Sequence, residues 1–309
     1  MSTFETRNKK RELIEKLIKS ALIIASVISI LTTFGILFSI LFEAIEFFQM
    51  RSFWYFITGM EWSPGVEGSK FGAVPIFAGT FVITIIALCV AIPVGLGSAI
   101  YMSEYASSTT RDYIKPILEV LAGIPTVVYG FFAAITVAPL IVKAADAVGL
   151  EATFNSALAS GVVMGIMIIP VISSLSDDVI RSVPDSQRKA ALGLGLTQGE
   201  TIRDIVIPSA LPGIISASLL GLSKALGETM IVVMAAGLRP NLSWNPLEDM
   251  TTVTVTIVNS LVGDFEFDSP ETLSAFALGL VLFVVTLILN IISLSLIRKF
   301  KEKYKVNTL

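Results

Sequence analysis

Long stretches without a charged residue dominate the chain, and polar residues are concentrated in the segments between them. A helix needs about 20 apolar residues to cross a ~30 Å hydrocarbon core. Uncharged or nearly uncharged stretches of that length cover residues 21–42, 71–103, 120–142, 152–176, 208–238 and 272–297. The pattern predicts an all-α, polytopic membrane protein with six transmembrane helices.

The composition supports this class and excludes several kinds of site. Of 309 residues, 54% are hydrophobic and 15% are charged, which lies outside the range of soluble domains. Cys89 is the single cysteine, and the chain has no histidine. These counts exclude an internal disulfide, a Cys/His metal site and histidine acid–base chemistry. We expect no cofactor in this chain.

The basic residues are distributed unevenly between the two sides of the predicted bundle. Seventeen Lys and Arg residues lie in the N-terminal segment, the loops 104–119 and 177–204 and the C-terminal tail, against four in the alternate segments. The positive-inside rule therefore predicts a multi-pass protein of the cell (inner or plasma) membrane with both termini in the cytoplasm. The first stretch is too long for a signal-peptide core, so we expect it to be retained. The outer segments carry twelve acidic residues against four basic ones, a balance that repels anions.

We expect two parts along the chain. Residues 1–20 read as a cytoplasmic amphipathic helix on the membrane surface, or more simply as a solvated anchor for the first span. Residues 21–309 form a single transmembrane domain with a long cytoplasmic loop at 177–212. The outer loop 48–72 contains a group of aromatic residues that predicts a short helix at the membrane interface.

Lys224 and Glu228 are the only charged residues in the fifth stretch. A charge near the bilayer centre costs about 2.5 to 3.5 kcal/mol on insertion scales. Their spacing of four predicts a buried ion pair on one helix face. Two interpretations remain open, namely a pair that serves a transport pathway and a pair that only holds neighbouring helices together.

The loop 177–212 carries strong helix signals. A helix is expected to begin at Pro184-Asp185-Ser186 and to stop at Gly193 or Gly195. Residues 197–200 form a capping box for a second short helix that is expected to end near Pro208. Such a pair of helices forms a rigid elbow, which serves either as a docking surface for another protein or only as a capped surface structure.

The elbow resembles the EAA loop of permease subunits of ABC importers. That motif, E-A-A-x-x-x-G followed nine residues later by I-x-L-P, corresponds here to Lys189, Ala190, Ala191, Gly195, Ile205, Ile207 and Pro208. Lysine stands where the family has glutamate, and Ile207 stands where it has leucine. The resemblance implies that this segment is a coupling helix that docks on an ATP-hydrolysing subunit.

Two further stretches resemble the phosphate-specific, PstC-type permeases of that family. They are residues 121–131, L-A-G-I-P-T-V-V-Y-G-F, and residues 224–230, K-A-L-G-E-T-M. The resemblance implies a type I ABC importer permease fold and a role in phosphate translocation for Lys224, Glu228, Thr229, Thr126 and Tyr129. Lys224 replaces the arginine usual in the family, which removes a planar fork suited to phosphate.

The same resemblance implies partners for the chain. They are a second homologous permease (PstA-like), two ATPase subunits (PstB-like) and an extracytoplasmic phosphate-binding protein (PstS-like), with lipid around the helices and no nucleic acid. The chain has no G-x-x-x-x-G-K-[ST] motif, so ATP and Mg are expected on the ATPase and not on this non-enzymatic subunit. The rival interpretations are a permease for another oxyanion such as molybdate or sulfate, and a self-sufficient secondary carrier that uses Lys224 and Glu228 as a proton relay.

Overall fold

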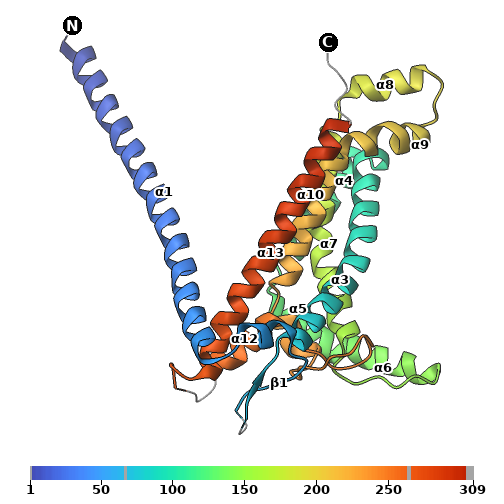
Figure 1. Cartoon of the computed structure of the whole chain (residues 1–309). Helices are drawn as coiled ribbons and strands as arrows, with labels where there is room; N and C mark the ends of the chain where they lie inside the picture. Colours follow the sequence, from blue (N-terminus) through green and yellow to red (C-terminus); the bar gives the residue numbers. More distant parts are fainter. Residues whose placement is uncertain (1, 66–67, 263–265, 304–309) are drawn as a thin grey trace.

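The computed structural model describes residues 2–65, 68–262 and 266–303 of the chain and is almost entirely helical (Figure 1). Its α-helices are α1 (Ser2–Met50), α2 (Phe53–Thr58), α3 (Val74–Ile100), α4 (Ser108–Ala122), α5 (Thr126–Phe132), α6 (Ala138–Ala147), α7 (Ala157–Arg181), α8 (Asp185–Gly193), α9 (Gln198–Thr201), α10 (Ile207–Leu226), α11 (Met230–Ala235), α12 (Val253–Val262) and α13 (Pro270–Lys303). Three π-helical turns, η1 (Tyr101–Tyr105), η2 (Ala133–Val137) and η3 (Ile202–Val206), continue longer helices. Strands β1 (Trp62–Ser63) and β2 (Lys70–Phe71) form a short antiparallel hairpin in which Trp62 pairs with Phe71.

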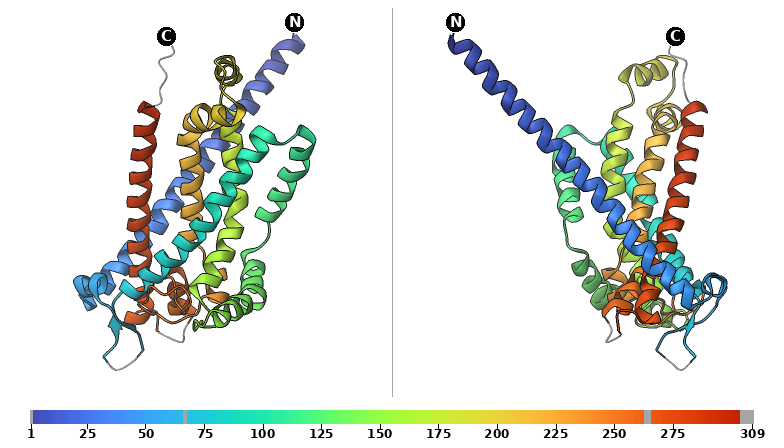
Figure 2. Two further views of the ribbon diagram at one scale, coloured as in Figure 1. Left: turned by 90° about the vertical axis from the view of Figure 1, so that its right-hand side faces the viewer. Right: turned by 60° about the vertical axis from the view of Figure 1, so that its left-hand side comes forward.

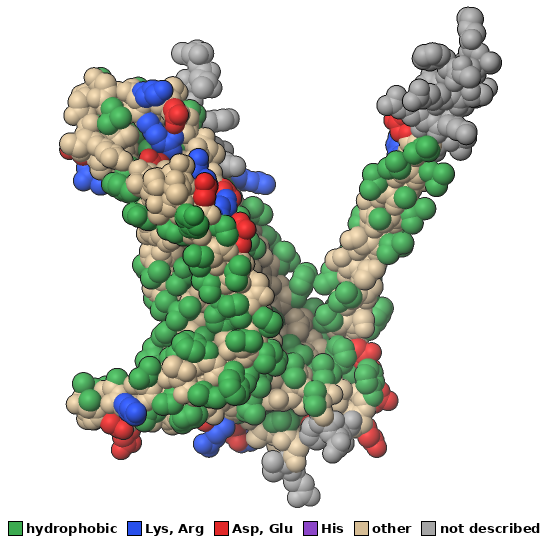
Figure 3. All heavy atoms as spheres, turned by 180° about the vertical axis from the view of Figure 1, so that it is seen from behind, with side chains coloured by type: hydrophobic (Ala, Val, Ile, Leu, Met, Phe, Trp, Pro, Cys, Tyr) green, Lys and Arg blue, Asp and Glu red, His purple; other side chains and the backbone are tan. Residues whose placement is uncertain are grey.

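Within these described residues, six helical stretches are long and apolar enough to cross a membrane. They are Ile14–Met50, Val74–Tyr105, Thr126–Ala147, Ala157–Arg181, Gln198–Leu226 and Pro270–Lys299. Figure 3 shows hydrophobic side chains over the middle of the visible face, with most of the charged ones toward its two ends. The prediction of an all-α protein with six spans is confirmed.

The third span differs from its expected bounds of 120–142. The helix is interrupted at residues 123–125, so α4 is a separate helix and the span begins at Thr126. Pro125 has no amide hydrogen and disfavours helical backbone at the residue before it, which explains the break. Helix α4 occupies the region expected to be a loop, and it lies beside α7 (Figure 2).

The fifth span begins earlier than expected. The elbow's second helix does not end near Pro208, because α9, η3 and α10 form one continuous span over Gln198–Leu226. Pro208 falls in the first turn of α10, directly after the π-helical turn η3. The π-helical turn has already interrupted the α-helical hydrogen-bond pattern there, so the missing amide hydrogen of proline removes little and the helix continues through it.

Helix α1 runs without interruption across the expected boundary at residue 20. It diverges from the other helices and meets α13 near the end opposite its own N-terminus (Figure 1). Its apolar side chains from Ile14 onward are mostly exposed, for example Leu22 at 64%. The position of its first turns relative to a membrane surface remains a prediction.

The centre of the molecule is the pair α3 and α7, which pack face to face. A Cβ atom added at Gly161 or Gly165 would lie 2.7 Å from the side chain of Ile86 or Val90. Small residues at these positions let two helix backbones approach closely, as is common in membranes. Helices α5 and α11 pack against α7 of this pair, and their buried residues form one hydrophobic cluster with those of α3 and α7.

The remaining elements lie at the two ends of the bundle. The elbow, formed by α8 and α9, lies at the same end as the first turn of α1 and the last turn of α13 (Figures 1 and 2). The hairpin, α2 and α12 lie at the other end. The predicted short helix in the loop 48–72 is present as α2.

Candidate functional site

The first of two helix breaks lies in the stretch 121–131. Pro125 is the residue before α5, and Thr126 is its first residue, half-buried. The hydroxyl of Tyr129 donates to the carbonyl oxygen of Leu121 at 2.9 Å, and the tyrosine is 8% exposed. Tyr129 therefore joins α5 to the end of α4 and gives the Leu121 carbonyl a second donor beside the Ile124 amide, which lies 3.3 Å away.

The second break follows α10. This helix ends at Leu226, and the chain passes through Gly227, Glu228 and Thr229 before α11 begins at Met230. The Oε1 atom of Glu228 accepts hydrogen bonds from the amides of Met230 at 3.0 Å and Ile231 at 3.3 Å. Glu228, which is 8% exposed, thus caps α11.

The prediction that Lys224 and Glu228 form an ion pair on one helix face is therefore wrong. Lys224 lies half-buried in the last turn of α10, whereas Glu228 lies beyond the end of that helix. Lys224 forms no ion pair within the described part of the chain. The carboxylate accepts hydrogen bonds from two backbone amides instead, because α10 ends before Gly227 and Glu228 no longer lies on the same helix face as Lys224.

The two breaks meet where α5 packs on α11. A Cβ atom at Gly130 would lie 2.9 Å from Sδ of Met234, 3.0 Å from the carbonyl oxygen of Met230 and 3.3 Å from Cα of Ile231. Only glycine allows this approach without a shift of one helix. The structure thus brings together the two stretches that the sequence singled out nearly 100 residues apart.

A row of threonines that the sequence analysis did not identify continues from the second break. Thr254 donates to the carbonyl oxygen of Glu228 at 2.8 Å, and its hydroxyl lies 3.0 Å from that of Thr252. The hydroxyl of Thr256 donates to the carbonyl oxygen of Thr252 at 3.0 Å. The alternating T-T-V-T-V-T run at 251–256 was the available signal, but alternation by itself is typical of a strand and not of a helix start.

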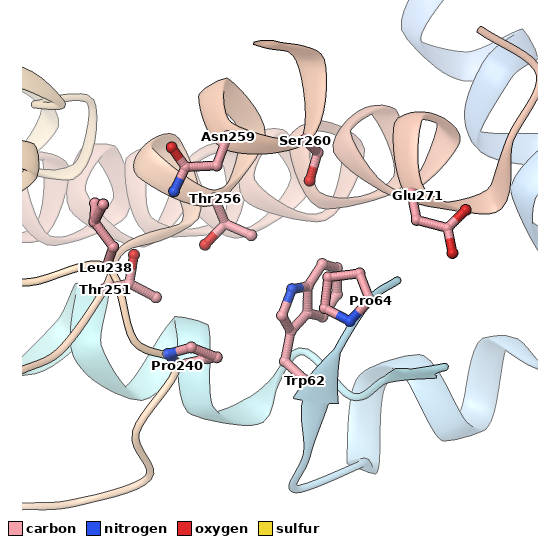
Figure 4. Close-up of a pocket in the computed structure, with 9 residues that line it drawn as sticks. All are labelled: Trp62, Pro64, Leu238, Pro240, Thr251, Thr256, Asn259, Ser260 and Glu271. Carbon is pink, nitrogen blue, oxygen red and sulfur yellow. The ribbon is translucent and has the colours of Figure 1, made fainter. Parts of the chain in front are cut away.

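The threonine row leads to a pocket of about 230 Å³ at the end of the molecule opposite the elbow. Figure 4 shows Trp62 and Pro64 of the hairpin facing Thr256 and Ser260 of α12. Thr251 also lines the pocket; it is 2% exposed, and its hydroxyl has no hydrogen-bond partner in the described part of the chain. Of the residues that line the pocket, Thr256 is connected through Thr252 and Thr254 to the backbone carbonyl of Glu228.

The elbow has the predicted local structure. Helix α8 covers Asp185–Gly193, and Gly195 has a φ of +88°, the left-handed conformation that favours glycine. The capping box is present, with the Thr197 and Glu200 side chains each bonded to the other's backbone amide. These expectations are confirmed.

The EAA-like residues differ in exposure. Lys189 and Ala190 are exposed, Ile205 and Pro208 are half-buried, and Ala191 is only 3% exposed. Leu192 and Leu194 are exposed at 50% and 83%, although they are large and apolar. This apolar surface on a charged end of the molecule is typical of a protein-binding site.

Arg188 holds the elbow to the helix bundle and was not identified from the sequence. Its Nη2 atom donates to Oε1 of Glu104 at 2.9 Å and to the carbonyl oxygen of Ile180 at 2.8 Å, and Nη1 donates to the carbonyl oxygen of Val183. The side-chain Nε2 of Gln198 donates to the carbonyl oxygen of Glu104 at 3.0 Å. Both helices of the elbow are therefore attached to η1 at the end of α3.

A comparison with protein families gives a match over residues 91–302, to the binding-protein-dependent transport system inner membrane component family. Among curated proteins, the chain is 36% identical over 252 residues to the phosphate transport system permease protein PstC of Mesorhizobium japonicum, covering 76% of this chain and 75% of the relative. It is 34% identical over 251 residues to a probable ABC transporter permease protein, YqgH, of Bacillus subtilis, covering 81% and 78%.

Solved structures share the fold at low sequence identity. A chain of the MetNI methionine ABC transporter in an inward-facing conformation superposes with a TM-score of 0.54 at 16% identity, covering 74% of this chain and 94% of that one. A chain of a bacterial ABC transporter involved in the import of alginate gives 0.55 at 16% identity, covering 73% and 79%. The fold is that of type I ABC importer permeases, and the chain belongs to the family of binding-protein-dependent transport system inner membrane components.

Proposed function

We propose that this chain is the transmembrane permease subunit of an ATP-driven phosphate importer and that it forms the translocation path with a second, homologous permease. The observation that carries the proposal is the meeting of two broken helices at Gly130, because both breaks lie in the stretches that resemble phosphate permeases. Relatives named for phosphate transport, at about a third identity over most of the chain, support the same substrate.

Lys224 is the group that attracts the anion in this proposal. It is half-buried in the last turn of α10, and its ammonium is not neutralised by Glu228. An ammonium acts on phosphate as a point charge and can serve without the geometric fork of arginine. Thr126, Tyr129 and Thr229 lie at the two breaks and complete the candidate path, while Glu228 holds α11 in place.

The elbow is the coupling element. Lys189, Ala190, Ala191 and Gly195, with Ile205 and Pro208 behind them, form or support the surface that docks on an ATPase subunit. Two such subunits supply ATP and Mg, and an extracytoplasmic phosphate-binding protein delivers the anion to an outer face that would otherwise repel it. In this arrangement both termini and the elbow lie in the cytoplasm.

The test is phosphate uptake by the complete assembly reconstituted in liposomes. We expect Lys224→Arg to retain uptake and Lys224→Met to lose at least about tenfold, since it removes the charge that attracts the anion. Lys143→Met is the matched control, because Lys143 is an exposed lysine of α6 away from both breaks. Native uptake by Lys224→Met at equal abundance would contradict the proposed role.

Two rival functions are separated by related measurements. A permease for molybdate or sulfate would show phosphate uptake that is suppressed by a small excess of that oxyanion. A self-sufficient carrier would move phosphate as the lone chain in liposomes without ATP. We expect neither result.

A further inference from the structure

A second pocket, of about 340 Å³, lies where the end of α1 meets α2 and the strand β2. Its lining includes Arg51, Ser52, Tyr55, Ser69 and Lys70. Arg51 and Lys70 are two of the four basic residues that the sequence places on this side of the bundle, against twelve acidic ones. Basic groups and hydroxyls thus come together on a side that is otherwise acidic.

Arg51 is held in position but keeps free donors. Its Nη2 atom donates to the hydroxyl of Ser69 at 3.3 Å, and its guanidinium carbon lies 5.5 Å from the ring centroid of Phe71. In the described part of the chain, one of the five N–H donors of this guanidinium is bonded to a side chain, so most of them remain available to a ligand. The contact with the aromatic ring holds the guanidinium near β2 without consuming those donors.

Lys70 contributes a second charge. Its Nζ atom lies 2.6 Å from Oε2 of Glu61, and this carboxylate raises the pKa of Lys70, so the ammonium stays protonated. Among the described residues at this pocket, Arg51, Lys70 and Glu61 together carry a net charge of about +1 at neutral pH. That value complements the single negative charge of a phosphodiester.

The neighbouring helix α2 indicates the depth of the pocket. Phe53, Trp54 and Tyr55 are exposed at 44%, 74% and 43% on a helix that directly follows the span of α1. Exposed Trp and Tyr side chains at the end of a span are typical of the headgroup level of a bilayer. The pocket therefore opens at the depth where lipid phosphates lie, beside apolar rings that can contact acyl chains.

We propose that this pocket binds the phosphate group of an anionic phospholipid, with Arg51 and Lys70 as its cationic ligands. Tyr55 and Ser52 lie at its edge and supply hydroxyl groups to the headgroup. The lipid stabilises the junction of α1, α2 and the hairpin, which the described structure otherwise holds through a cluster of aromatic side chains. This inference is independent of the transported substrate.

The test uses the purified, delipidated full-length chain in detergent, with lipid binding measured by native mass spectrometry. Dioleoyl phosphatidylglycerol is the probe, and dioleoylglycerol, which lacks the phosphate, is the comparison lipid. We expect Arg51→Gln with Lys70→Gln to weaken phosphatidylglycerol binding at least about tenfold. We expect Arg51→Lys to have a smaller effect, because it keeps the charge and loses the fork.

Arg239→Gln is the matched control, since Arg239 is 84% exposed and does not line this pocket. Its binding of phosphatidylglycerol should equal that of the native chain. An unchanged melting temperature of each variant without lipid shows that folding is not the cause of a loss.

Three results would overturn the proposal. Equal lipid binding by the double variant and the control would show that the two charges do not contribute to binding. Equal binding of dioleoylglycerol would show that only acyl chains are recognised. Displacement of the lipid by inorganic phosphate at equal concentration would show a site for the free anion and not for a headgroup.

Discussion

Glu228 has a different role from the one its spacing suggested. Its carboxylate is bound by two backbone amides at the start of α11, and its carbonyl oxygen accepts a bond from Thr254. Glu228 therefore connects the second break to the start of α11 through its side chain and to α12 through its backbone carbonyl. A cap and a translocation role make different demands on the side chain, so substitutions can separate them.

We predict that Glu228→Ala destabilises the chain by about 1 to 2 kcal/mol, the usual cost of removing a capping side chain. Glu228→Gln keeps an acceptor oxygen and should lose less stability. Chemical denaturation in detergent measures the stability, and phosphate uptake by the assembly measures function. If both variants lose the same stability, the two hydrogen bonds of Oε1 are not what the residue contributes.

Glu248 gives a prediction about pH. Hydrogen bonds from Ser243, Asn241 and Asn245 lower the pKa of this carboxyl group. A group whose pKa is lower in the folded state contributes stability above its unfolded pKa, here about 4.5, and this contribution is lost as the pH falls through the folded value. The carbonyl oxygens of Leu247 and Glu248 accept hydrogen bonds from the backbone amides of Thr153 and Ala157 near the start of α7. The loss of stability at low pH should therefore weaken these two hydrogen bonds.

We therefore expect hydrogen-exchange protection of the Thr153 and Ala157 amides, corrected for intrinsic rates, to decrease as the pH is lowered below about 4. Glu248→Gln should remove this pH dependence. Protection that falls equally in the variant would assign the effect to another group.

At the scale of elements, the elbow shows how one residue sets the direction of two helices. Gly193 and Gly195 are both exposed, and neither has an atom within 4 Å of an added Cβ. They differ in backbone, because Gly193 is helical and Gly195 has a φ of +88°. The pair is a natural control for the effect of conformation without a change in contacts.

We predict that Gly195→Ala strains the turn by about 1 to 2 kcal/mol, the cost of left-handed backbone for a residue with a Cβ atom. Gly193→Ala should be neutral or slightly stabilising. In the assembly, the first change should lower transport and transport-coupled ATP hydrolysis together, and the second should leave both unchanged. Coupled hydrolysis at the native rate in Gly195→Ala would show that the elbow geometry is not needed for coupling.

At the scale of the whole molecule, the two ends differ in structure and charge. The elbow lies at one end and the hairpin with α2 at the other (Figure 1). Because Cys89 is the single cysteine, replacing it by serine yields a background in which one new cysteine reports one position. Leu194 on the elbow and Met60 after α2 are suitable, at 83% and 72% exposure.

In cells that produce this chain without the ATPase subunits expected to cover the elbow, we predict that a membrane-impermeant thiol reagent labels Met60→Cys while the cells are intact. It should label Leu194→Cys only after the membrane is opened. The positive-inside distribution is the physical reason. The opposite pattern would reverse the orientation and remove the elbow from the compartment that contains ATP.

Several features could be predicted from the sequence because they depend on local chemistry. Hydrophobic length determines that six stretches cross a membrane, and Thr197 with Glu200 is sufficient for a capping box. Gly195 adopts left-handed backbone because the chain turns there and only glycine does so at no steric cost. None of these features needs a distant segment.

Other features were decided only by the tertiary structure. Arg188 meets Glu104, 84 positions away, and Thr254 meets Glu228 across 26 positions. Glu228 and Lys224 are suitably spaced for an ion pair, but spacing has this meaning only while a helix continues, and α10 ends between them. The sequence by itself determined that six segments lie in the membrane and that the elbow turns at Gly195. The partner of each polar group was decided by which segments pack together, because a buried donor or acceptor bonds to whatever the fold brings within reach.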